Sequence, residues 1–346
     1  MLSSTAPTSR AFTSRSERLA AWAACQRQPS DRQPSDRELD FNASSSMLRD
    51  LLRRGLVGMT DLRDDPQWFF EAHRVVAQHG EELGEGFWTR FTVQFNLFAG
   101  TVLAVGNASH IEQLRVMQEA GELGCFALTE RFAGVSSGMI VETIATHDPE
   151  TRTFVITSPN EGSKKNWISQ GFVADRSVVV ADLHVGGTSH GPHAFLIDFR
   201  VASGGSGEKQ LVHGVRLADM GRKTVANDLD NAWIAFDDVR VPEAALLDRY
   251  AGIDAEGRYV RRGSPGDAAA ADTHASASGG AGGAGGVGGA VVRGMHAMEM
   301  IGQRLFTGRV AVAQAALAFG RYLFAKTREY TDSKLCWAPK GTPAWS

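Results

Sequence analysis

Apolar residues recur at three- and four-residue spacing through the first third of the chain. Phe69, Ala72 and Val76 form one apolar face directly after Asp65-Pro66. That pair is a favourable helix start, because Asp accepts from free backbone N–H groups and Pro suits the first helical position. Further helices are predicted over 87–105 and 110–119. The pattern therefore predicts an amino-terminal helical domain.

After Gly121 the pattern changes to short runs of β-branched and aromatic residues bounded by turn-forming residues. These runs predict strands over 139–141, 153–157, 177–182, 193–199 and 231–236. No helical pattern separates them, so we expect an antiparallel sheet or barrel. Helical spacing returns over 295–330. The predicted fold class is α+β: an amino-terminal helical domain, a central antiparallel β-barrel-like domain, and the start of a carboxy-terminal helical bundle.

Two segments of biased composition set the expected boundaries. Residues 1–43 are rich in Ser, Arg, Gln and Pro, which is typical of a disordered tail or a targeting segment. Residues 263–294 are mostly Gly, Ala and Ser, which predicts a flexible insert. The Gly280-x-Gly282-x-x-Gly285 pattern within them follows no predicted strand, so we do not interpret it as a dinucleotide-binding fingerprint. The expected parts are 1–43 tail, 44–121 helical domain, 122–250 β domain, 251–294 linker with the insert, and 295–346 the first helix of a truncated helical domain.

Composition excludes several classes of function. A net charge of −3 over 346 residues gives no reason to expect nucleic acid or an anionic membrane as a partner. The three cysteines lie far apart, which argues against a disulfide scaffold or a zinc site and fits a reducing compartment. No apolar run is long enough to predict a membrane span.

Candidate chemistry gathers where the predicted strands end. Thr129 and Glu130 follow an apolar run, and a loop of small residues comes next. Gly134, Ser136 and Ser137 in that loop would let a ligand approach the backbone closely. This loop also fits Gly-x-Ser-x-Gly, the hydrolase elbow, but an elbow needs a strand before it and a helix after it. Taken alone, Thr129 at the close of a strand favours an ordinary turn.

A second candidate segment is Trp167-Ile168-Ser169, at the end of another apolar run. Its indole could stack on a planar heterocycle, although a core Trp is the commoner case.

Taken in chain order, the motifs resemble the acyl-CoA oxidases of the acyl-CoA dehydrogenase and oxidase superfamily. The resemblance covers about 85–259. Its motifs are Cys-Phe-Ala-Leu-Thr-Glu over 125–130, Asp-Pro-Glu-Thr over 148–151, Trp-Ile-Ser over 167–169, His-Ala-Phe over 193–195, and Phe-Asp-x-Val-Arg-Val-Pro over 236–242. The resemblance implies FAD as cofactor, contacted by Thr129, Trp167, Ile168 and Ser169. It further implies that Gly134, Ser136 and Ser137 contact the acyl-CoA thioester.

The same resemblance implies oxidation of a fatty acyl-CoA to the trans-2-enoyl-CoA, with electrons passing to O₂, in a peroxisomal homodimer. The alternatives are a dehydrogenase that passes electrons to an electron-transfer flavoprotein, a mitochondrial location, and a truncated, non-catalytic binding or assembly protein. The family's general-base Glu is expected beyond Ser346, so no catalytic residue is assigned. Two departures are a longer loop over 131–137 and Lys334 where the family has Arg.

Overall fold

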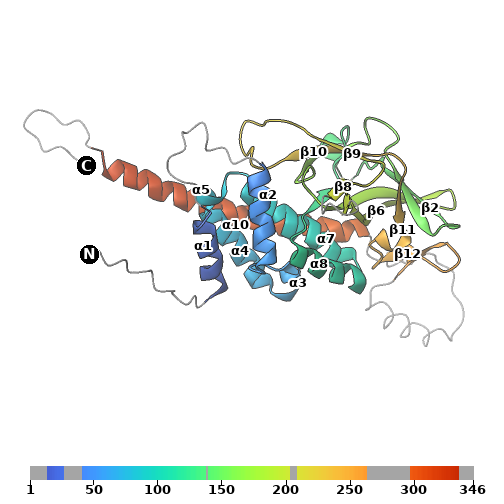
Figure 1. Ribbon diagram of the computed structural model, residues 1–346, viewed down its shortest axis with the longest axis horizontal. Coiled ribbons are helices and arrows are strands. Elements are labelled where there is room, and N and C mark those ends of the chain that lie inside the picture. Colours follow the sequence, from blue (N-terminus) through green and yellow to red (C-terminus); the bar gives the residue numbers. More distant parts are fainter. Residues whose placement is uncertain (1–13, 27–40, 138, 203–208, 263–296, 335–346) are drawn as a thin grey trace, which may run out of the picture.

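The computed structural model describes residues 14–26, 41–137, 139–202, 209–262 and 297–334. A helical region and a sheet region lie side by side along the long axis, and the helix α10 (Ala297–Asp332) runs past both of them (Figure 1). The Gly/Ala/Ser-rich insert predicted over 263–294, with its Gly280 to Gly285 pattern, lies outside the described residues.

The amino-terminal region is helical, as predicted. Its elements are α1 (Arg15–Ala24), α2 (Phe41–Arg53), α3 (Asp61–Asp64), α4 (Pro66–Gln78), α5 (Gly80–Leu83), α6 (Phe87–Thr92), the π-helix η2 (Val93–Phe98), α7 (Ala99–Val105) and α8 (Ala108–Ala120). The predicted start of α4 is confirmed, because the Asp65 side chain accepts from Trp68 N at 3.1 Å. The helix predicted over 87–105 is continuous but contains the π-helical turn.

The segment 1–43 was expected to be a disordered tail or a targeting segment, and disorder is wrong for the part that the structure describes. Within the segment 1–43, residues 15–24 form α1, which Ser14 and Glu17 cap reciprocally. Leu19 is fully buried and the Trp22 ring packs against Phe87 at 6.0 Å between centroids. Composition hid this helix because its few large apolar residues all lie on the face that meets the helical domain.

The β region contains two main sheets and two short hairpins. Its elements are β1 (Gly124–Ala127), β2 (Ile144–Asp148), β3 (Thr153–Thr157), β4 (Lys165–Ser169), β5 (Arg176–Val185), β6 (Thr188–Asp198), β7 (Arg200–Ala202), β8 (Lys209–Leu211), β9 (Val215–Asp219), β10 (Asn231–Phe236), β11 (Val239–Pro242), β12 (Ala251–Ile253) and β13 (Tyr259–Arg261), with short 3₁₀ turns η3 (Gly134–Ser136) and η4 (Glu243–Ala245). The larger sheet has the order β1-β5-β2-β3-β11 with β6 beside β5, and the smaller has β4-β10-β9.

The prediction of an antiparallel sheet is wrong in part, because β5 pairs in parallel with both β1 and β2. Parallel neighbours need long connections, and the chain supplies them through the loop after β1 and through β4, which belongs to the other sheet. The strand predicted over 139–141 is also wrong, since only an isolated bridge joins Ser137 and Ile140 there. The fold class α+β holds.

Strand β5 lies between two apolar cores. Val178 and Val180 belong to the core shared with the helices. Val179 and Ala181, which point to the other face, belong to a second core against the smaller sheet. A strand buried on both faces reads as a continuous apolar run, which explains why this segment was predictable from sequence.

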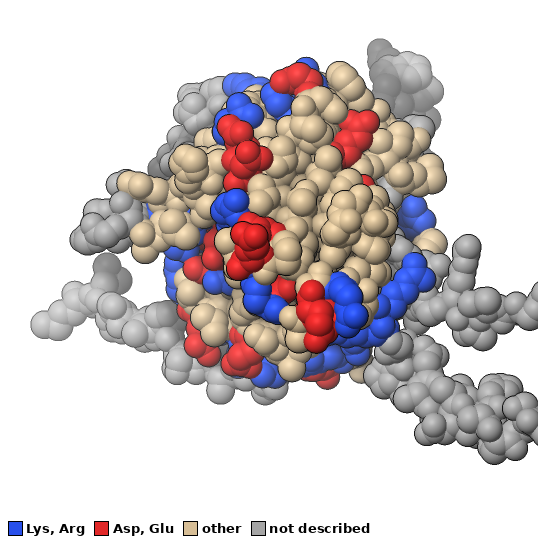
Figure 2. All heavy atoms as spheres, turned by 90° about the vertical axis from the view of Figure 1, so that its right-hand side faces the viewer, with Lys and Arg blue, Asp and Glu red and all other residues tan. Residues whose placement is uncertain are grey.

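Seen from the sheet end of the molecule, acidic and basic side chains are interspersed around uncharged surface (Figure 2). This mixture agrees with the small net charge. In the part of the chain that the structure describes, no helix is long and apolar enough to span a membrane.

Candidate functional site

The predicted site residues come together where β1 ends and β4 begins. Asn166 N donates to Thr129 O at 2.9 Å, and Glu130 forms an antiparallel bridge with Lys165. Thr129 and Trp167 therefore lie on adjacent segments where the two sheets meet, although Thr129 and Asn166 are 37 positions apart in the sequence. The fold brings together the two motifs that sequence analysis singled out.

Trp167 has an unusual backbone and an exposed ring. Its φ is +57°, and 56% of the residue is exposed. A bulky residue rarely adopts positive φ without compensating contacts. Here the pairing of β4 with β10 shifts register between Ala232 and Ile234, and Trp167 N contacts Met220 Sδ at 3.3 Å. Bulges of this kind re-aim a side chain next to functional sites, and this one leaves an indole facing solvent.

The three residues of the Trp-Ile-Ser motif do not share one environment. Ile168 is 3% exposed and belongs to the core between the sheets. Ser169 is half-buried, and its Oγ accepts from Asn231 Nδ2 at 3.1 Å. A ligand at this edge can therefore reach the Trp167 side chain and part of Ser169, whereas the Ile168 side chain serves the core.

The loop after β1 connects both groups of predicted residues. Ser137 Oγ and Thr129 Oγ1 are 2.8 Å apart and share one hydrogen bond. Gly134 opens the turn η3 with a φ of +53°, and the half-buried Ser136 follows in that turn. A 3₁₀ turn with no strand leading into it is not the strand–turn–helix context of a hydrolase elbow. Gly138, the last residue of that pattern, lies outside the described residues.

A hollow of about 420 Å³ opens at the start of β4, next to Asn166 and Met220, and the Trp167 side chain is not part of its lining. Its lining residues are Arg131, Lys164, Asn166, Asp219, Met220 and Trp233. The Lys164 ammonium lies 5.0 Å from the centroid of the Trp233 ring, and Arg131 and Lys164 both pair with Glu161. Aromatic surface and two cations at one opening suit a planar ligand that carries negative charge.

Sequence analysis did not assign Arg131, Lys164 or Trp233 to the site. Arg131 and Lys164 could have been found from the sequence, because Arg131 directly follows Glu130 and Lys164 directly precedes Lys165. Trp233 comes from β10, and only the pairing of β10 with β4 brings it to this edge.

A buried ion pair supports the site from beneath. Lys165 Nζ lies 2.7 Å from Glu130 Oε1, and both side chains are almost fully buried. Glu130 also accepts from Glu142 N, Thr143 N and Thr143 Oγ1 at 2.7–2.9 Å. Burial lowers the pKa of Lys165 to about 8, against the opposing effect of Glu130. The pair fixes the start of β4, and therefore the backbone next to Trp167.

Apolar side chains are exposed around the same loop. Phe132 is 73% exposed, Met139 80% and Ile140 42%. Large apolar residues gathered at a ligand-sized opening are typical of an interaction surface. Within the described ranges, no group of three or more His, Cys, Asp or Glu side chains is arranged to hold a metal ion.

No family model matches the chain. Similar proteins are found among curated proteins and among solved structures. Acyl-coenzyme A oxidase 3, peroxisomal, of Arabidopsis thaliana is 36% identical over 170 residues, which are 49% of this chain and 24% of that protein. The crystal structure of acyl-CoA oxidase 3 from Yarrowia lipolytica aligns with a TM-score of 0.66 and 21% identity, over 96% of this chain and 42% of that one. Acyl-CoA oxidase-1 of Caenorhabditis elegans, complexed with FAD and ATP, aligns with a TM-score of 0.55 and 22% identity, over 72% of this chain and 37% of that one.

The chain spans about a quarter of the length of the curated relatives that it matches. The sequence likeness extends over about half of this chain, and the fold likeness extends over most of it. Both agree with the order of motifs from residue 125 to residue 242. The chain is therefore similar in sequence to acyl-CoA oxidases over about half of its length, and it has the fold of the solved acyl-CoA oxidase structures.

Proposed function

We propose that this chain takes part in the FAD-dependent oxidation of a fatty acyl-CoA to the trans-2-enoyl-CoA, with O₂ as electron acceptor. The observation that carries the proposal is the shared edge of β1 and β4. There the exposed Trp167 ring and the Thr129–Ser137 hydroxyl pair lie on adjacent segments, and Asn166, which joins these segments, lines a hollow that also contains two cations. A related protein, acyl-CoA oxidase-1 of C. elegans, has been crystallised with FAD.

The residues present fit FAD. The Trp167 indole offers a face on which a tricyclic ring can stack. Thr129 and Ser137 carry two hydroxyl protons, and the hydrogen bond between them uses one. One hydroxyl proton therefore remains to be donated to a ring heteroatom. Arg131 and Lys164 provide positive charge for phosphate groups at the mouth of the hollow.

Bound FAD would supply the acceptor for a hydride from the acyl chain. The described residues have positioning roles. The bulge at Trp167 orients the indole, and the exposed Phe132 and Met139 can exclude water from a bound acyl thioester. Glu130 cannot remove a substrate proton, because its two oxygens already accept four hydrogen bonds from buried donors. We assign the general base to none of the described residues.

The remaining parts of the proposal rest on the relatives. The name of the Arabidopsis relative includes the word peroxisomal, which supports a peroxisomal location over a mitochondrial one. We also propose that the protein forms a homodimer, and that its electron acceptor is O₂ rather than an electron-transfer flavoprotein. Gly134, Ser136 and Ser137 are proposed as contacts of the acyl-CoA thioester.

The first experiment measures FAD binding by the visible absorbance of the purified protein and by titration of the apoprotein with FAD. Replacing Trp167→Ala should weaken FAD binding by roughly five- to 150-fold, since one stacking contact contributes about 1–3 kcal/mol. Phe324→Ala is the matched control, because Phe324 is an exposed aromatic residue on α10. Equal FAD affinities for wild type and Trp167→Ala would contradict the placement of the flavin.

The second experiment mixes the FAD-loaded protein with a fatty acyl-CoA and measures release of hydrogen peroxide. Peroxide release supports an oxidase. Flavin reduction without peroxide would favour a dehydrogenase. A colourless protein whose melting temperature FAD does not raise would overturn the proposal in favour of a non-catalytic homologue.

A further inference from the structure

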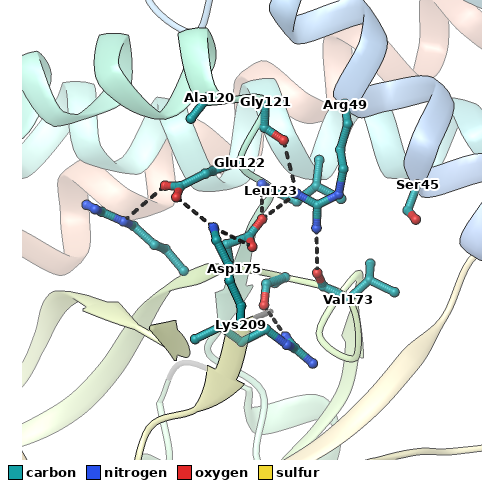
Figure 3. A network of polar contacts seen from close by, with 12 residues as sticks. Ser45, Arg49, Ala120, Gly121, Glu122, Leu123, Val173, Asp175 and Lys209 are labelled. Atoms are coloured by element: carbon teal, nitrogen blue, oxygen red, sulfur yellow. Dashed lines mark hydrogen bonds and ion pairs between the residues drawn. The ribbon is translucent and has the colours of Figure 1, made fainter. Parts of the chain in front are cut away.

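A second and larger hollow, of about 660 Å³, lies at the opposite end of β1 from Thr129. Figure 3 shows the polar contacts among several of its lining residues. Its lining residues are Asn42, Ser45, Ser46, Arg49, Arg53, Ala120, Glu122, Phe172, Val173, Asp175, Arg200 and Lys209. The hollow is an independent feature, because Glu122 and Asp175 precede β1 and β5, whereas Thr129 follows β1. Its volume falls in the range of small-molecule sites.

Helix α2 contributes one polar face to this hollow. Asn42, Ser45, Arg49 and Arg53 follow one another at spacings of three and four residues, so they lie on the same side of the helix. Figure 3 shows Ser45 and Arg49 projecting from α2 toward the end of the sheet. Sheet and helix thus present polar groups to a common space.

Two of the four cations in this lining are neutralised. Arg49 Nη1 lies 2.5 Å from Asp175 Oδ2, and Lys209 Nζ lies 2.9 Å from Asp175 Oδ1. Lys209 also pairs with Glu122 at 2.7 Å. Although burial alone would raise the pKa of Asp175, Arg49 and the Leu123 N–H lower it below its ordinary value. Asp175 therefore stays ionised, and both carboxylates of the lining are shared among cations.

The other two cations form no ion pair in the part of the chain that the structure describes, and the nearby carboxylates Asp50 and Asp175 act on Arg53 and Arg200 only through longer-range Coulombic attraction. Arg200 donates to Phe172 O at 2.6 Å and to Ala174 O, which are carbonyls. Arg53 makes one long hydrogen bond, of 3.4 Å, to Ala120 O. Carbonyl oxygens orient a guanidinium but do not cancel its charge. The lining thus carries two positive charges in excess, on two guanidinium groups that contact backbone carbonyls.

We propose that this hollow binds a small phosphorylated solute, with its phosphate group between Arg53 and Arg200. Guanidinium groups recognise phosphate oxygens in paired, charge-assisted hydrogen bonds. A dianionic phosphate would balance the two excess charges. The half-buried Phe172 and Val173 offer apolar wall for the remainder of the ligand. The proposal does not depend on the flavin assignment.

Calorimetric titration of the full chain with inorganic pyrophosphate, at constant ionic strength, tests it. Wild type should bind, and Arg53→Gln should weaken binding at least about fivefold, since hydrogen bonds to charged groups are the strong ones. Arg54→Gln is the matched control, because Arg54 is the next residue of α2, is exposed, and does not line the hollow. It makes the same change in net charge and should bind as wild type.

Two further variants test the charge of the lining and the location of the site. Glu122→Gln should strengthen pyrophosphate binding several-fold, because it removes negative charge from the lining. Trp167→Ala should leave pyrophosphate binding unchanged, which separates this hollow from the candidate cofactor site. No binding to wild type, equal losses in Arg53→Gln and Arg54→Gln, or no gain in Glu122→Gln would each overturn the proposal.

Discussion

The buried ion pair beneath the candidate site gives the sharpest test of the structure. Lys165 is fully buried, and its ammonium donates to Glu130 Oε1 and Val180 O at 2.7 Å and to Leu128 O at 3.3 Å. Lys165→Met leaves the Glu130 carboxylate buried without its counterion. Removing one partner of a buried pair costs about 3–5 kcal/mol, so we expect the free energy of unfolding at pH 7 to fall by about that much.

The pH dependence of this loss follows from the pKa of Lys165, which is about 8 in the folded chain against an ordinary value of 10.5. Between these two pH values the unfolded chain binds more protons than the folded chain. The Lys165 contribution to wild-type stability therefore rises with pH across this window, by at most about 1.4 kcal/mol per pH unit. Lys165→Met lacks this group, so the difference between wild type and variant should widen from pH 8 to pH 10.

Denaturant unfolding followed by far-UV circular dichroism, at pH 7 and at several values from 8 to 10, measures both quantities. Lys164→Met is the matched control, since Lys164 is the neighbouring residue and pairs with the exposed Glu161. Its loss should stay below about 1 kcal/mol. A wild-type advantage that shrinks as the pH rises would refute the argument, because it would mean that the fold raises the pKa of Lys165.

Three further predictions follow from single residues. Trp167→Gly should leave the free energy of unfolding unchanged or raise it by about 1 kcal/mol, because glycine tolerates the φ of +57°. The same variant should bind FAD more weakly. A large loss of stability would contradict backbone strain at Trp167. Burial lowers the pKa of His73 to about 4, so wild type should lose stability as the pH falls from 6.5 towards 4, and thermal melts of His73→Leu should show a smaller acid loss. Gly124→Ala would place a Cβ 2.3 Å from the Phe98 ring, and we expect a loss of about 1–3 kcal/mol in urea unfolding. Gly302→Ala meets nothing within 4 Å in α10 and should stabilise by up to about 1 kcal/mol; equal effects of the two alanines would contradict the close packing at Gly124.

Local sequence patterns were enough to predict those helices and strands whose spacing of apolar residues has one physical interpretation. The bounds of β3 and β10 are those predicted, 153–157 and 231–236, because short β-branched runs between turn residues leave few alternatives. The helix after Asp65 was equally readable from its cap and apolar face. The order of motifs was also sufficient to indicate the similarity to acyl-CoA oxidases, since chain order needs no knowledge of contacts.

The tertiary structure decided everything that depends on distant pairing. Whether β5 has parallel or antiparallel neighbours follows from how the chain crosses between sheets, which no local pattern records. Trp167 and Ile168 are adjacent in sequence, yet a bulge opposite β10 exposes the first and buries the second. The cations Arg53 and Arg200 are 147 positions apart, and only the fold brings them to one hollow. Sequence fixes local backbone preference, whereas burial and net charge at a site are sums over neighbours that only the fold assembles.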